Sequence, residues 1–190
     1  MARIRPATPD DAAGIARVHV DSWRSTYAGI VPAEYLAGLS YERSTANWER
    51  SLGSPESRSV YLVAEDESGR IVGFVCGGPG RDEHPDYSGE LYAIYLFREN
   101  QGQGIGRLLM TALARELLAR GYASWLIWVL KDNPARGFYE RMGGVYVMEK
   151  DIEIGGVKLR EAAYGWPDIS VLVIENVESE HHGKRDSTES

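Results

Sequence analysis

Three glycines at alternate positions, Gly102, Gly104 and Gly106, stand between an apolar run and an amphipathic segment. Glycine adopts backbone conformations that a Cβ atom forbids, so successive N–H groups can point into one concavity at a helix N-terminus. The helix dipole adds about half a positive charge at that end, which favours a bound phosphate even without a basic side chain. Arg107 follows closely enough to assist. The pattern predicts a phosphate-binding loop.

Two common phosphate loops do not fit this spacing. A dinucleotide fingerprint requires G-x-G-x-x-G and an acidic residue about twenty positions later, and neither is present. A Walker loop requires Gly-Lys-Ser/Thr, whereas Gly106 is followed by Arg107 and Leu108. A glycine-rich turn without a ligand remains the alternative from this stretch alone.

The segment Gln101–Gly106 (QGQGIG) matches the pattern Q/R-x-x-G-x-G/A, and in it the chain resembles the GCN5-related N-acetyltransferase (GNAT) family. The order of expected elements from about Ser59 to Trp166 supports this resemblance. The supporting stretch Asn133–Gly144 (NPARGFYERMGG) combines Asn-Pro, a short helix with Phe-Tyr and a double glycine. The first sixty residues agree only in the number of helices.

The resemblance implies an α/β layered fold, with a mixed, mostly antiparallel sheet, flanking helices and a central parallel strand pair that splays apart. It also implies acetyl-CoA as co-substrate and no metal. The splayed strands would be Leu91–Phe97 and Ser124–Leu130, and the pantetheine arm would pair with the first. Asn133 would look the same as a simple helix cap. The expected cofactor-binding residues are Ile94, Tyr95, Leu96, Gln101, Gly102, Gln103, Gly104, Ile105, Gly106, Arg107, Asn133 and Arg136.

Acetyl transfer needs a neutral amine, stabilisation of the carbonyl oxygen and a proton for the leaving thiolate. Tyr139 matches the family tyrosine that serves as general acid, and a phenol stays protonated near neutral pH. The alternative is an aromatic helix residue that packs on the sheet, a role that suits Phe138 better. Glu90, eleven residues before Gln101, is the candidate general base; a solvated carboxylate at a strand end is the competing interpretation.

Weaker substitutes for the base are Tyr92 and Glu65 or Asp66. The same Tyr92, with Trp23 and Tyr27 at the end of the first long helix, forms the expected acceptor-binding set. Core packing of these aromatic residues is the alternative. The expected reaction is N-acetylation of a small molecule, polyamine or peptide amine by direct transfer in a ternary complex. The competing function is an acyl-CoA-binding sensor or interaction module without turnover.

The elements that would position these residues follow from capping and periodicity. Thr8-Pro9-Asp10-Asp11 starts a helix that carries His19, expected to be a packed core residue. Around it we expect a strand Arg3–Pro6, a helix about Tyr41–Leu52, a hairpin of Ser59–Ala64 with Ile71–Gly77, a solvent-facing loop 78–89, a helix running to Gly121, and a closing hairpin of Val145–Ile154 with Val157–Trp166 around Gly155-Gly156. Beyond Ser170 we expect an edge strand or loose packing.

Length and composition predict one domain, residues 1–174, and a disordered polar tail, residues 175–190. The net charge of −7 argues against nucleic acid as partner and suits a cationic acceptor, although many soluble proteins are mildly acidic. The single cysteine, Cys76, excludes an internal disulfide and lies in an apolar run as an expected core residue. With no signal peptide and no membrane span, the expected location is the cytoplasm. The resemblance also suggests a homodimer.

Overall fold

The computed structural model describes residues 2–174, which form one seven-stranded sheet flanked by helices. The strand order is β1-β2-β3-β4-β5-β7-β6, and every neighbouring pair is antiparallel except β4 and β5. The strands are β1 (Arg3–Pro6), β2 (Val60–Glu65), β3 (Ile71–His84), β4 (Tyr87–Leu96), β5 (Trp125–Leu130), β6 (Val145–Ile154) and β7 (Val157–Trp166).

Helices cover both faces of the sheet. They are α1 (Ala12–Thr26), α2 (Ala33–Ala37), α3 (Tyr41–Leu52), α4 (Ile105–Ala119) and α5 (Arg136–Arg141), with short 3-10 turns at Pro9–Asp11 and Arg98–Asn100. On β3, Phe74 packs against Trp48 of α3 with ring centroids 5.0 Å apart, whereas a Cβ on Gly77 would lie 3.0 Å from Leu113 of α4. Residues an odd number apart on a strand face opposite ways. Thus α3, with α1, covers one face and α4 covers the other.

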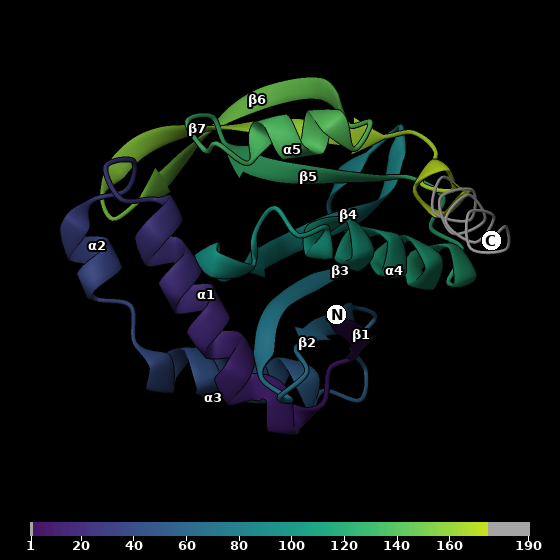
Figure 1. The fold of residues 1–190 in the computed structure, drawn as a ribbon. Coiled ribbons are helices and arrows are strands. Elements are labelled where there is room, and N and C mark those ends of the chain that lie inside the picture. The colour runs from purple at the N-terminus through teal and green to yellow at the C-terminus, as the bar shows by residue number, and fades with distance from the viewer. Residues whose placement is uncertain (1, 175–190) are drawn as a thin grey trace, which may run out of the picture.

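The parallel pair β4 and β5 stays together for only two residue pairs, Gly89 with Trp125 and Glu90 with Leu126. Beyond Glu90 the two strands diverge toward α1, so that the β1–β4 half of the sheet separates from the β5–β7–β6 half (Figure 1). This arrangement confirms the predicted fold class with its splayed central pair. It leaves backbone groups along both inner edges without a neighbouring strand.

The predicted loop over residues 78–89 is a strand hairpin instead, although residues 80–86 are mostly exposed, as predicted. The β3–β4 hairpin continues through it, with Pro79 opposite Gly89 and His84 opposite Tyr87. The Tyr87 ring packs directly over Gly165 of β7, where an added Cβ would lie 2.3 Å from Tyr87 Cζ. The glycines and proline of this stretch are typical of a loop, so the sequence pattern did not predict a strand here. The contact between Tyr87 and Gly165, which are far apart in the sequence, stabilises the strand. The hairpin tip therefore lies against the β5–β7–β6 half of the sheet.

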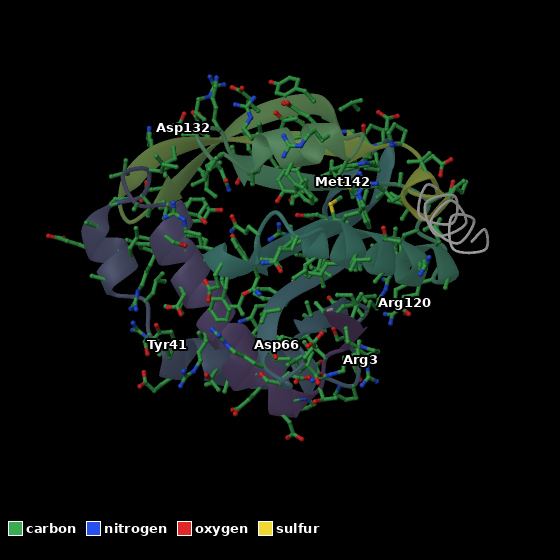
Figure 2. The ribbon with its side chains drawn as sticks, viewed as in Figure 1. Arg3, Tyr41, Asp66, Arg120, Asp132 and Met142 are labelled. Carbon is green, nitrogen blue, oxygen red and sulfur yellow. The ribbon has the colours of Figure 1, made fainter. Side chains whose placement is uncertain are left out.

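Leu109, Leu113 and Leu117 of α4 are fully buried in the main apolar cluster. Met142, which belongs to the same cluster, lies above α4 in Figure 2. After β7, residues 171–174 form a helical turn instead of the expected edge strand or loose packing. Its Leu172 is 3% exposed, and the Leu172 carbonyl accepts a hydrogen bond from Thr111 Oγ1 of α4 at 3.1 Å. The tail expected to be disordered lies outside the described residues. Within residues 2–174, none of the helices has the length and apolar character needed to span a membrane.

Candidate active site

A cavity of about 530 Å³ fills the gap between the diverging strands. Five consecutive residues of β4, 92–96, and three of β5, 127–129, line it. Neighbouring side chains on a strand point to opposite faces, so a run of consecutive lining residues means that the strand edges themselves form the walls. The cavity thus lies in the plane of the sheet, where a strand is missing.

The cavity is lined from both faces of the sheet. Tyr139 of α5 packs near Trp166, and the Trp166 ring centroid lies 6.0 Å from that of Trp125 on β5. Tyr27, after α1, packs in one cluster with Leu130 of β5. Trp125 and Leu130 are five positions apart on β5 and face opposite ways. Because Tyr27 and Tyr139 both line the cavity, it passes through the sheet. Two molecules can therefore meet in it from opposite sides.

The glycine loop opens one end of this cavity. Gly102 and Gly104 take positive φ angles of 75° and 81°, which glycine adopts without strain, and a Cβ on either would have no atom within 4 Å. Gly104 is the N-cap of α4, so the first N–H groups of that helix border the open space. Gly106 packs closely instead, since its Cβ would lie 3.2 Å from Phe138 Cζ. The loop has the backbone of an anion-binding helix start.

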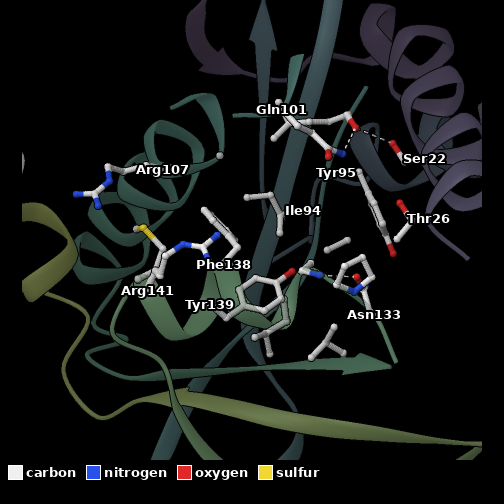
Figure 3. Close-up of a pocket in the computed structure, with 18 of the residues that line it drawn as sticks. Ser22, Thr26, Ile94, Tyr95, Gln101, Arg107, Asn133, Phe138, Tyr139 and Arg141 are labelled. Atoms are coloured by element: carbon white, nitrogen blue, oxygen red, sulfur yellow. Dashed lines mark hydrogen bonds between the residues drawn. The ribbon is translucent and has the colours of Figure 1, made fainter. Parts of the chain in front are cut away.

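The backbone of β4 offers hydrogen-bonding groups to the gap. The Phe97 N–H donates to the Val72 carbonyl of β3 at 3.0 Å, and successive residues of a strand direct these groups to alternate sides. The N–H and C=O groups of Ile94 and Leu96 therefore point away from β3. The Leu96 carbonyl accepts bonds from Ser22 Oγ at 3.1 Å and Gln101 Nε2 at 3.4 Å (Figure 3). On the side away from β3, Ile94 has no neighbouring strand.

Tyr139 directs its hydroxyl into the middle of the cavity (Figure 3). The residue is 4% exposed, and burial raises the pKa of its phenol well above the usual value near 10. Within residues 2–174 its hydroxyl has no hydrogen-bond partner, so it is available to a ligand. Phe138 beside it packs against Gly106 in the first turn of α4.

Asn133 stabilises the turn before α5, whose N-cap is Ala135, and also lines the cavity. Its Oδ1 accepts a bond from the Ala135 N–H at 2.8 Å, and its Nδ2 donates to Tyr27 Oη at 3.2 Å. Tyr27 Oη in turn lies 3.2 Å from Tyr95 Oη. Burial raises the pKa of both tyrosines, which stay neutral donors. This chain of polar groups connects α1, β4 and the segment before α5.

The structure brings together most of the predicted cofactor residues. Lining the cavity are Ile94, Tyr95, Leu96, Gln101, Gly102, Gly104, Gly106, Arg107 and Asn133. Three predicted residues lie elsewhere. Gln103 donates to the Glu99 carbonyl at 2.9 Å, Ile105 is buried in the core, and Arg136 donates to Tyr164 Oη at 2.9 Å and to the Lys131 carbonyl.

Glu90 is held by a partner that the sequence did not reveal. Its carboxylate accepts hydrogen bonds from the Arg81 N–H at 2.9 Å, from Arg81 Nε at 2.9 Å and from Arg81 Nη2. The residue is 2% exposed and lies where β4 and β5 still pair, outside the cavity lining. Its role as a base stays a prediction.

Of the expected acceptor residues, Tyr27 and Tyr92 line the main cavity. Trp23 instead lines a second cavity of about 290 Å³ among α1, α2 and α3. Its ring packs on Tyr27 with centroids 4.7 Å apart, so it supports the main cavity from behind. Across residues 2–174, no three His, Cys, Asp or Glu side chains gather as potential metal ligands.

Sequence reasoning missed several residues of the cavity, notably Ser22 and Thr26 of α1, Trp128 of β5 and Arg141 of α5. Arg141 is five positions from Arg136, which at 3.6 residues per turn puts the two on different sides of the helix. From Tyr139, helical spacing favours Arg136, three positions away on the same face, over Arg141, two positions away. Thr26 shows a usable signal, because it follows Ser22 by four positions on one helix face.

Comparison with known proteins agrees with this geometry. A sequence model of the acetyltransferase (GNAT) family matches residues 15–144. The uncharacterized N-acetyltransferase YuaI of Bacillus subtilis is 45% identical over 174 residues, which are 90% of this chain and 96% of the relative. The chain belongs to the acetyltransferase (GNAT) family. A probable N-acetyltransferase of Mycobacterium tuberculosis is 29% identical over 92% of this chain and 90% of its own length.

Solved GNAT structures share the fold. The PaiA N-acetyltransferase of Thermoplasma acidophilum, in complex with coenzyme A, superposes with a TM-score of 0.62 at 21% identity, over 85% of this chain and 98% of that one. YncA of Salmonella typhimurium, with its cofactor acetyl-CoA, gives 0.64 at 20% identity, over 87% and 93%. The predicted family, the predicted fold and the predicted enzyme class, an N-acetyltransferase, are confirmed.

Proposed function

We propose that this GNAT protein transfers the acetyl group of acetyl-CoA directly to an amine of a small molecule, polyamine or peptide within a ternary complex. The observation that carries the proposal is the parting of β4 and β5 after Glu90 and Leu126, beside the open glycine loop. A cavity with an unpaired strand edge and an anion-binding helix start suits a long ligand with a diphosphate at one end.

In this proposal the diphosphate of coenzyme A binds the N–H groups between Gln101 and Arg107. Gly102 and Gly104 leave room there because no atom lies within 4 Å of where their Cβ would be. The pantetheine arm pairs with the outward backbone groups of Ile94 and with the N–H of Leu96, whose carbonyl already accepts two bonds, and so completes the sheet. Arg141, which lines the cavity, adds a positive charge for a phosphate.

The acetyl group then reaches Tyr139. The amine nitrogen attacks the thioester carbonyl carbon, the C–S bond breaks, and the Tyr139 hydroxyl donates its proton to the leaving thiolate. Its raised pKa keeps the phenol protonated over the whole physiological range, which an acid requires. The missing hydrogen-bond partner of the hydroxyl within residues 2–174 supports this role.

The amine must lose its proton before it attacks, and Glu90 is the proposed base. The carboxylate lies next to the apex of the splay, where β4 and β5 part. Because Arg81 occupies it with three donors, Glu90 accepts a proton only through a water molecule or after the ion pair opens.

The location of the protein in the cytoplasm and its assembly as a homodimer also remain predictions.

The test is a coupled assay of the purified protein with acetyl-CoA, a thiol reagent and a panel of monoamines, diamines, polyamines and peptides. We expect release of free coenzyme A that depends on both the protein and one class of amine, with the acetylated amine detected by mass spectrometry. Binding of acetyl-CoA in a calorimeter without coenzyme A release over the whole panel would favour the sensor function instead. No binding at all would contradict both.

A further inference from the structure

The ammonium group of Lys150 lies on the sheet face that carries Tyr27, next to the cavity. Trp128 of β5 lines the cavity, and the Lys150 ammonium of β6 lies over its indole ring, 3.9 Å from the ring centroid. Lys150 Nζ is also 3.5 Å from Glu161 Oε1 and 3.4 Å from Asp82 Oδ2. One cation is thus surrounded by an aromatic face and two carboxylates.

Register places these side chains on the same face. Glu161 of β7 is paired with Leu130 of β5 on one side and with Lys150 of β6 on the other, and paired residues share a face. Trp128 is two positions from Leu130 and faces the same way. Leu130 packs with Tyr27, which lines the cavity. The ammonium site therefore continues the cavity on the side opposite Tyr139.

The carboxylate of Glu161 is less well paired than that of Glu90. Its side chain is 12% exposed, and its ion pair with Lys150 is long, whereas Arg81 gives Glu90 three donors. Burial raises the pKa of Glu161, and Lys150 and Arg81 only partly oppose this effect. A desolvated carboxylate with a distant partner gains when a cation that binds it more closely replaces that partner.

We propose that Trp128 and Glu161 bind the ammonium group of the acceptor, and that the Lys150 side chain occupies this site as a tethered competitor until the acceptor displaces it. The inference rests on the proposed amine acetylation and narrows the acceptor to a primary amine that presents its ammonium to an aromatic face beside a carboxylate. Lys150 suits a competitor because its ammonium is chemically the group that it excludes. Its side chain is 39% exposed and can swing into solvent.

The test compares the KM for an amine substrate at saturating acetyl-CoA in the parent and in single variants. Lys150→Met removes the competitor but keeps the apolar stem, so we expect the amine KM to fall about threefold to tenfold. Glu161→Gln removes the charge that holds the ammonium, so we expect the amine KM to rise about tenfold. Neither variant should alter the KM for acetyl-CoA. Matched controls are Lys158→Met and Glu153→Gln, an exposed cross-strand pair of the same hairpin, which should change neither constant.

A second readout does not depend on turnover. The indole N–H signal of Trp128, assigned in NMR spectra with Trp128→Phe, is followed during titration with 1,4-diaminobutane. We expect the signal to shift, and to shift at lower amine concentration in Lys150→Met. The inference is overturned if the indole signal does not shift, or if the amine KM is the same in the parent, in Lys150→Met and in Glu161→Gln. The proposed acetylation would still stand. A shift without any acetylation supports the ammonium site and contradicts the proposed function.

Discussion

The hydroxyl of Tyr139 is the single group that most clearly connects this structure to chemistry. The residue is buried, and its hydroxyl points into the cavity and has no hydrogen-bond partner within residues 2–174. A buried hydroxyl without a protein partner is costly unless a ligand or water satisfies it. The arrangement favours a catalytic over a packing role, because packing alone would be served equally by phenylalanine.

We therefore predict that Tyr139→Phe folds normally but lowers kcat by roughly tenfold to ten-thousandfold, the range for acid–base groups. The KM for acetyl-CoA should change little, since the ring remains. Steady-state kinetics check this, with Tyr146→Phe, an exposed tyrosine of β6, as control. A parent-like kcat in Tyr139→Phe would remove this residue from the mechanism.

Glu90 raises a different question, because its ion pair with Arg81 explains its burial without catalysis. If Glu90 is the base, Glu90→Gln lowers the rate most at low pH, where a substitute base is scarce. Arg81→Met would then retain the pH dependence of the rate, because Glu90 is still present. We predict that the rate of Glu90→Gln falls most at low pH and that the pH–rate profile of Arg81→Met does not show this loss. If both variants lose stability in urea unfolding and neither changes the profile, Glu90 only holds the β3–β4 hairpin.

At the scale of elements, the loop from Gln101 to Arg107 joins β4 to α4 and forms the anion site. Gly104→Glu would place a negative side chain where the structure leaves open space. We predict loss of coenzyme A binding in a calorimeter. Gly156→Glu is the matched control, because Gly156 also has a positive φ, 77°, with no atom within 4 Å, but lies in the β6–β7 turn. Unchanged affinity in Gly104→Glu refutes the loop assignment.

The contact between α1 and the sheet predicts a pH effect. His19 stacks on Tyr95 with centroids 5.5 Å apart, and burial lowers its pKa to about 4. The unfolded chain protonates this histidine near pH 6.5, so its contribution is complete above that pH and is lost as the pH falls to about 4. We predict that His19→Phe removes on the order of 2 kcal/mol of this pH dependence. The free energy of unfolding of the parent and of His19→Phe is measured in urea at pH 7, 5.5 and 4.5. If the prediction is wrong, it falls by the same amount with pH in both proteins.

Elements with strong local signals could be predicted from the sequence. The strands around Gly155-Gly156 have the predicted bounds because a two-residue turn with positive φ angles sets the register. The β3–β4 hairpin could not be predicted, since the contact of Tyr87 with Gly165 joins residues far apart in the sequence. Without this hairpin the Arg81 partner of Glu90, nine positions away, was not recognised either. Lys150 and Glu161 are opposite each other in the predicted β6–β7 register, but the contact of Lys150 with Trp128 depends on the tertiary fold. Backbone sites follow local patterns, whereas side-chain partners depend on the tertiary fold.

At the scale of the whole molecule, the sheet consists of two halves held together at the apex near Glu90 and separated by the cavity beyond it (Figure 1). Such a gap exposes polar backbone groups that a folded protein normally pairs. A ligand that adds a strand would satisfy them and link the halves. The two halves of the sheet thus flank a gap between β4 and β5 that one more strand would fill.

Hydrogen–deuterium exchange with and without acetyl-CoA tests this account most directly. We predict slower exchange in two segments that the ligand would contact, residues 92–96 of β4 and residues 101–107 of the glycine loop. The β6–β7 turn should exchange at the same rate in both states. Saturation with acetyl-CoA that leaves both segments unchanged would contradict the proposal that the thioester enters between the diverging strands.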